Sequence, residues 1–125
     1  MSGIEIKEFI LNNRESLVEK IMAEQLQLMP EINDRYNPGM IKKIESDTSD
    51  ILNYLAQAVF IDEKSIISNY YNWLNSVLKE RGLRLDFLKK HLQAAENVLK
   101  RELDQKNFNL IQKFLNEAEL SLKDV

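Results

Sequence analysis

Apolar side chains recur every three or four residues along most of the chain, which is the spacing of one face of an α-helix. The most regular stripe lies in the second half of the chain and consists of Leu85, Leu88, Leu92, Ala95, Leu99 and Leu103. No stretch alternates apolar and polar positions in the way that a half-buried strand does. The pattern therefore predicts an all-α fold.

Glycines and prolines are few, and they divide this pattern into five predicted helices, at residues 5–29, 40–60, 62–80, 85–103 and 107–122. Pro30 ends the first helix, because proline has no N–H and disfavours helical geometry in the residue before it. Asp62 is predicted to be the N-cap of the third helix, and Arg81 with Gly82 is predicted to end it. Asn107 is expected to cap the fifth helix.

The predicted connections near residues 61, 82–84 and 104–106 are short, and short connections favour antiparallel packing of the helices that they join. A length of 125 residues is enough for one domain with its own core. We therefore expect a single-domain bundle of four or five helices. A crossed, globin-like arrangement fits the same apolar pattern, so both topologies stay open.

Composition narrows the classes of function. The chain has no cysteine, which excludes disulfides and thiolate metal sites and fits a reducing cytoplasm. Its 17 basic and 20 acidic residues are mixed along the chain and give a net charge of −3, a balance that disfavours nucleic-acid binding. No apolar run approaches the roughly 20 residues needed to cross a bilayer. We expect a cytoplasmic protein that binds neither nucleic acid nor membrane.

The single histidine, His91, lies on a second apolar row beside the main stripe of its helix. A haem ligand or a proton switch is one interpretation of such a residue. We favour a histidine at the edge of the core that bonds to solvent, because the proximal histidine of a globin precedes the last two long helices and His91 lies within one of them. No HExxH, P-loop, GxGxxG or GxSxG motif occurs. The sequence thus predicts no enzyme, no metal and no cofactor.

Aromatic residues gather in the third predicted helix. Tyr70, Trp73 and Val77 share one face of it, whereas Tyr71 lies on another face with Leu74 and Leu78. Two interpretations fit, a pocket wall for an apolar or planar ligand and ordinary packing at the core and its rim. We favour packing, and we keep Tyr70, Trp73 and His91 as the candidate pocket residues of an alternative small-ligand binding protein.

Two predicted helices carry more apolar surface than one packed face requires. Beside the main stripe of the fourth helix, a second row contains Phe87, Ala94 and Val98. The first helix is widened in the same way by Phe9, Leu11, Val18 and Met22. Since large exposed apolar patches are rare on monomers, we expect a homodimer with Phe87, Ala94 and Val98 in its interface. The alternative is that the fourth helix is central, so that both of its rows are internal.

Residues 45–103 contain the pattern D-x4-L-x-Y-L-x2-A followed by Y-x2-W-x4-L-x2-R-G, formed by Asp47, Leu52, Tyr54, Leu55 and Ala58 and then by Tyr70, Trp73, Leu78, Arg81 and Gly82. Leu88, Leu92 and Leu99 follow. With this pattern the segment resembles the helical N-terminal module of bacterial cobalamin-binding regulatory proteins and, more loosely, the non-haem globin-like modules of stressosome proteins. Ile51 stands where many members have a histidine, so no role is carried over to that position. The resemblance implies a sensory or dimerisation module with a signalling protein as partner, and it does not imply that this segment binds cobalamin.

Overall fold

The computed structural model describes residues 3–83 and 85–122, and within them the chain forms helices and no strand. The helices are α1 (Gly3–Asn12), α2 (Arg14–Leu28), α3 (Ile32–Arg35), α4 (Pro38–Ile61), α5 (Ser65–Glu80), α6 (Leu85–Glu102) and α7 (Gln105–Ser121). The all-α prediction is therefore confirmed, with seven helices in this part of the chain in place of the four or five predicted. None of these helices combines the length and the apolar composition that crossing a membrane requires.

A break at one residue divides the first predicted helix into two. Asn13 leaves helical geometry, with φ −112° and ψ 16°, and its side-chain amide donates to the carbonyl oxygen of Phe9 at 2.8 Å. Asparagine competes with the backbone for such hydrogen bonds, which explains why the helix is interrupted here. The break changes the packing partner of the chain, because α1 packs mainly on α4 whereas α2 packs mainly on α6.

Side-chain caps fix the starts of α4 and α7. The side chain of Asn37 accepts the N–H of Met40 at 2.8 Å, and Pro38 occupies the first turn, where its missing N–H costs nothing. At α7 the cap is Asp104, whose carboxylate accepts the N–H of Asn107 at 2.8 Å. The prediction that Asn107 caps this helix was wrong, because Asn107 is the third residue of the helix and donates to the cap.

Asp62 ends α4, so the prediction that it begins the third helix was wrong. It adopts the left-handed conformation, with φ 60°, and the N–H of Glu63 then bonds to the carbonyl oxygen of Ala58 at 3.0 Å. Aspartate tolerates this conformation better than most residues do. Gly82, with φ 82°, closes the end of α5 in the same way and confirms the predicted stop.

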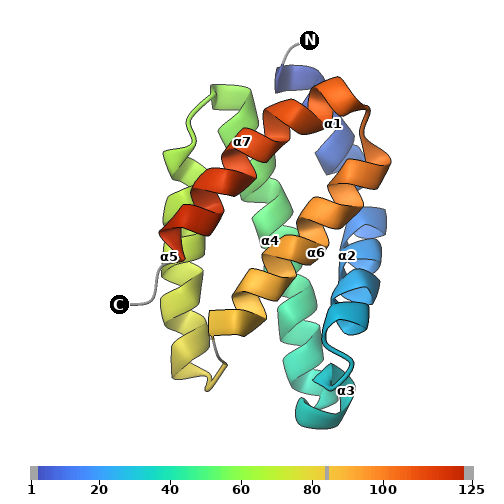
Figure 1. The fold of residues 1–125 in the computed structure, drawn as a ribbon, viewed down its shortest axis with the longest axis vertical. Coiled ribbons are helices and arrows are strands. Elements are labelled where there is room, and N and C mark those ends of the chain that lie inside the picture. Colours follow the sequence, from blue (N-terminus) through green and yellow to red (C-terminus); the bar gives the residue numbers. More distant parts are fainter. Residues whose placement is uncertain (1–2, 84, 123–125) are drawn as a thin grey trace.

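The central element is α4 (Figure 1), which runs through the middle of the molecule between α5 and α2. In the view of Figure 1, α6 and α7 cross in front of it. The N-terminal end of α1 approaches the last turns of α4 so closely that a Cβ on Gly3 would lie 2.6 Å from the carbonyl oxygen of Val59. Buried side chains therefore line α4 over most of its length, namely Ile44, Thr48, Ile51, Leu52, Leu55, Ala56, Ala58 and Val59.

Both apolar rows of α6 are internal. Phe87, Ala94 and Val98, which the sequence placed in a dimer interface, are at most 2% exposed within the single chain. The physical reason is that α6 packs against both α2 and α7, so more of its surface is covered than a single neighbour would cover. These three residues belong to the core, and the sequence prediction for them was wrong. Whether the chain forms a dimer through another surface is a separate question, and the homodimer stays a prediction.

A charge introduced at Val98 tests this assignment. Val98→Glu places a carboxylate where the valine is fully buried, and we expect it to lower the free energy of unfolding by about 4 kcal/mol. Gln93→Glu adds the same charge to an exposed position of the same helix, and we expect a change of less than about 1 kcal/mol. Urea denaturation followed by circular dichroism measures both. A folded Val98→Glu variant that only dissociates a dimer would contradict the core assignment.

Candidate functional site

Three aromatic side chains from α4 and α5 form a continuous aromatic surface. Tyr70 and Trp73 are three residues apart on α5, so they lie on one face of that helix, and Tyr54 reaches them from α4. The rings of Tyr54 and Tyr70 are stacked, with centroids 4.2 Å apart and an interplanar angle of 19°. The rings of Tyr70 and Trp73 follow at 5.6 Å with an angle of 40°. We call Tyr54, Tyr70 and Trp73 the aromatic surface.

Burial differs sharply among these three residues. Tyr70 lies in the middle and is buried, whereas Tyr54 is 41% exposed and Trp73 is 56% exposed. Tyr70 therefore packs in the core, whereas Trp73 contacts it from the rim. The other tyrosine of this helix segment, Tyr71, points into the core and is fully buried. An exposed indole beside an exposed phenol gives α4 and α5 a large apolar area that no helix covers within the described residues.

A groove of about 630 Å³ follows this surface. It is lined by Asp50, Asn53, Tyr54, Ile66, Asn69, Tyr70 and Trp73. Both Tyr70 and Trp73 thus line a hollow, as the pocket interpretation of the sequence requires, but His91 does not belong to it. Besides the hydroxyls of the tyrosines and the indole N–H, the lining offers the amides of two asparagines and a single carboxylate, so the groove combines aromatic rings with hydrogen-bonding groups.

Two aspartates, Asp47 and Asp50, lie close enough to Tyr70 for their charges to act on it. Asp47 is paired with Arg81 at the end of α5, with 2.9 Å between the guanidinium and the carboxylate. Burial raises the pKa of Tyr70 far above its ordinary value, and the negative charges of Asp50 and Asp47 raise it further, whereas Arg81 opposes them. Tyr70 is therefore neutral at physiological pH. Its phenol can donate a hydrogen bond but cannot act as a base.

His91 lies in the core and not at its edge, so the prediction that it bonds to solvent was wrong. It is 2% exposed, and its Nε2 lies 2.6 Å from the hydroxyl oxygen of Thr48 on α4. That hydroxyl can also donate to the carbonyl oxygen of Ile44 at 2.8 Å. Threonine has one hydroxyl hydrogen, so the tautomer of the imidazole decides whether Nε2 donates to Thr48 or accepts from it. In either tautomer the second ring nitrogen, Nδ1, is buried without a partner.

The polar residue Gln25 of α2 is also buried, and sequence reasoning missed it. Its amide nitrogen lies 3.4 Å from the carbonyl oxygen of Phe87 and 3.9 Å from the sulfur of Met29, while its amide oxygen has no partner. A signal did exist in the sequence, because Gln25 follows Ile21 by four residues and so continues the apolar stripe of its helix. Gln25, Thr48 and His91 make polar contacts between helices and are too enclosed to receive a substrate.

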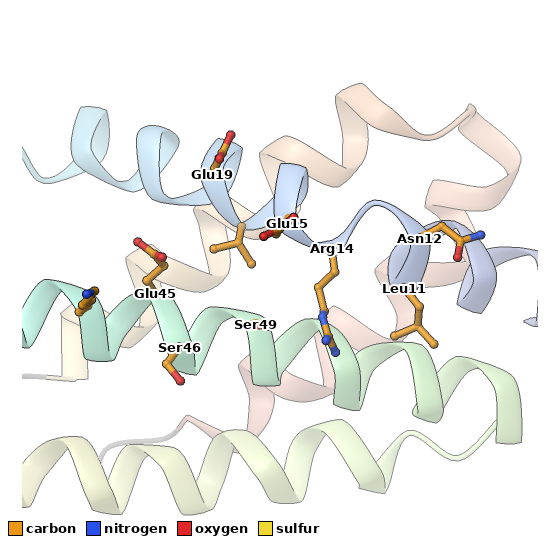
Figure 2. Close-up of a pocket in the computed structure, with 10 residues that line it drawn as sticks. Leu11, Asn12, Arg14, Glu15, Glu19, Glu45, Ser46 and Ser49 are labelled. Carbon is orange, nitrogen blue, oxygen red and sulfur yellow. The ribbon is translucent and has the colours of Figure 1, made fainter.

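A second hollow, of about 640 Å³, lies between the α1–α2 junction and α4 (Figure 2). Figure 2 shows Leu11 and Arg14 pointing toward α4 and Glu45 pointing from α4 toward α2. Its lining mixes charges of both signs, with Arg14 and Lys42 among Glu15, Glu19 and Glu45. Across the described part of the chain, no three histidine or carboxylate side chains are grouped in a way that would hold a metal ion.

Comparison with known proteins gave no match to a family model, to a curated protein or to a solved structure. The resemblance to bacterial sensory modules therefore stays a prediction. Most of the residues that carry it are buried, among them Leu52, Leu55 and Leu78. Helix packing accounts for these buried positions. It does not account for Tyr54 and Trp73, which belong to the same pattern and are exposed.

Burial of His91 predicts a loss of stability in mild acid. Desolvation lowers the pKa of His91 from 6.5 to about 4. Between about pH 6.5 and about pH 4, His91 is protonated in the unfolded chain but stays neutral in the folded chain. The contribution of His91 to stability is therefore complete above about pH 6.5 and declines as the pH falls to about 4. We expect the free energy of unfolding to fall by about 2 kcal/mol between about pH 7 and about pH 5.

The measurement is urea denaturation across this pH range, with His91→Gln as the matched variant. The variant has no titrating group at this position, so its stability should change much less over the same interval, whatever its absolute value. Carboxylates titrate mostly below this interval and are common to both proteins. Parallel dependence of the two proteins on pH would show that His91 is not held neutral by burial.

Proposed function

We propose that the chain is a non-enzymatic regulatory module that binds another protein through the aromatic surface on α4 and α5. The observation that carries this proposal is the exposure of Trp73 and Tyr54 on either side of the buried Tyr70. Tryptophan and tyrosine are the residues most enriched at the energetic centres of protein interfaces, because they bury a large rigid area at low entropic cost. Covering water-exposed aromatic rings of this size with a partner contributes a large hydrophobic free energy to binding.

The surroundings of the aromatic surface support the same proposal. Protein interfaces combine an apolar centre with a polar rim that exchanges hydrogen bonds with the partner. Here the rings form the centre, and the side chains of Asp50, Asn53 and Asn69 line the same groove.

A sensory role in cytoplasmic bacterial signalling is the finer part of the proposal, and it rests on the resemblance described above. Tyr54, Tyr70 and Trp73 all belong to the residue pattern that carries this resemblance. The proposal therefore assigns the exposed members of that pattern to recognition of a signalling partner. A globin-like arrangement of the helices belongs to the same part of the proposal.

Small-ligand binding is the alternative that a specific observation favours, because a groove of about 630 Å³ has the size of many ligand sites. Such sites enclose most of the ligand, whereas two of the aromatic walls here are largely exposed. Thermal-shift screening separates the two functions. A ligand at about 100 times its dissociation constant adds roughly 2.7 kcal/mol of stability, and a saturable hit that quenches Trp73 fluorescence would favour the ligand-binding function.

The homodimer remains part of this proposal without the interface that the sequence suggested. Light scattering after size exclusion tests it at tens of micromolar protein. A mass of two chains supports a dimer, and a mass of one chain excludes it at that concentration.

A photo-crosslinking residue at position 73 tests the proposed surface in the cell of origin. We expect Trp73→benzoylphenylalanine to give one discrete covalent adduct on irradiation. The same replacement at Leu120 of α7, which is 58% exposed and lies outside the groove, should give none. The crosslinked protein, once identified and purified, should bind the Trp73→Ala variant at least about ten-fold more weakly than the unsubstituted chain.

Two controls make this result specific. Leu120→Ala removes a side chain of similar exposure and should leave the affinity unchanged. Trp73→Ala should leave the chain folded and lower the free energy of unfolding by less than about 2 kcal/mol, because the indole is 56% exposed. Equal affinities of the Trp73→Ala and Leu120→Ala variants would refute the assignment of binding to the aromatic surface.

A further inference from the structure

We infer that the aromatic surface binds an arginine side chain of its protein partner, with the guanidinium over the exposed rings and beside the carboxylate of Asp50. This inference rests on the proposed function and adds the chemistry of the partner to it. Three observations support it, namely the negative charge in the groove, the lysine that lies over the exposed ring of Phe60, and the exposure of the groove walls.

Asp50 is the one charged residue in the lining of the groove. The neighbouring aspartate, Asp47, is already neutralised by Arg81 at 2.9 Å. Across residues 3–83 and 85–122, by contrast, Asp50 makes no ion pair and no side-chain hydrogen bond, although its charge acts on Tyr70. The groove therefore presents one uncompensated negative charge next to three aromatic rings, and the faces of such rings are themselves negative.

This chain covers aromatic rings with its own cations elsewhere. The ammonium of Lys7 lies 4.0 Å from the ring centre of Phe60, which is 45% exposed on α4, and Lys64 lies 5.4 Å from the ring centre of Phe114. Within the described part of the chain no lysine or arginine lies over Tyr54 or Trp73 in this way. Indole is the best of the aromatic partners for a cation. The strongest cation-binding ring of the chain is thus left open to a cation from outside.

Arginine fits this arrangement better than lysine does. A guanidinium is planar, stacks on an indole or a phenol, and still directs its N–H groups sideways to a carboxylate. Asp50 can accept two of those hydrogen bonds, and the amide oxygens of Asn53 and Asn69 are further acceptors in the same groove. The ammonium of lysine can neutralise the Asp50 carboxylate, but it has no planar surface that stacks on the rings.

The exposure of the walls favours a side chain carried by a protein over a free amine. Tyr54 and Trp73 leave the groove open along one side, so a small cation would keep much of its surface in water. A partner protein adds apolar contacts around its arginine and closes that side. A second copy of this chain fits poorly, because a two-fold contact centred on the groove would bring the two Asp50 carboxylates to the same interface.

The experiment uses three short apolar peptides that are identical except at one central position, which holds arginine, lysine or the neutral isostere citrulline. Binding to the full chain is followed by fluorescence, because Trp73 is the only tryptophan and reports directly on the groove. We expect saturable binding of the arginine peptide at least ten-fold tighter than that of the citrulline peptide, with the lysine peptide between them. The preference should weaken as salt is added.

Two aspartate variants locate the effect. Asp50→Asn keeps the shape of the side chain, and it should reduce the preference for arginine over citrulline to about two-fold. Asp34→Asn removes the same charge from an exposed position on α3, away from α5 in Figure 1, and should keep the full preference. Loss of the preference in both variants would show an effect of net charge alone and would overturn the inference.

The other outcomes separate this inference from the function on which it rests. If the arginine and citrulline peptides bind equally, or if neither binds, the inference is overturned. The proposed function is then still tested by the crosslinking experiment at position 73. Equal affinity for free arginine amide and for the arginine peptide assigns the groove to a small cation and overturns the choice of a protein partner. If light scattering shows a dimer and Trp73→Ala dissociates it, the groove binds a second copy of the chain, and this outcome overturns the inference as well.

Discussion

Burial of α4 along most of its length is the constraint on which the rest of this fold depends. Four other helices, α1, α2, α5 and α7, pack on this one element, and each must present an apolar face to it. The hydrophobic gain of covering α4 from several sides orients these helices. It also determines what remains open, since the stripe of α4 that carries Asp50 and Tyr54 faces outward beside α5. The candidate site thus combines an uncovered stripe of the central helix with the neighbouring face of α5.

The core that results contains polar groups, and they contact one another across helices. Thr48 on α4 and His91 on α6 share a hydrogen bond between residues 43 positions apart in the sequence, while Gln25 of α2 reaches the backbone of α6. Burying such groups is unfavourable unless they are bonded, and two of their atoms have no partner. Apolar residues in their place would pack without that cost, so these contacts restrict which packing the helices adopt rather than add to its stability.

The aromatic residues show how one residue type acquires two roles in the same fold. Tyr71 and Phe114 fill the interior, where their area contributes to the hydrophobic core. Trp73 lies two positions after Tyr71, on a different face of α5, and remains in water. A tryptophan that is 56% exposed contributes less to folding than a buried one, because it removes less apolar area from water. The proposed role of Trp73 is therefore in binding a partner.

The sequence by itself determined the helical class and several helix ends, because these follow from local rules. Apolar spacing predicted helices throughout, Gly82 marked the end of α5 at a positive φ, and Pro30 lay just beyond the end of α2. Tertiary structure decided which faces are covered. The second row of α6, including Val98, became core, and Trp73 became surface, although both lie on equally plausible apolar faces in the sequence. The reason is that periodicity describes one helix at a time, whereas burial depends on how many neighbours that helix has and where they lie.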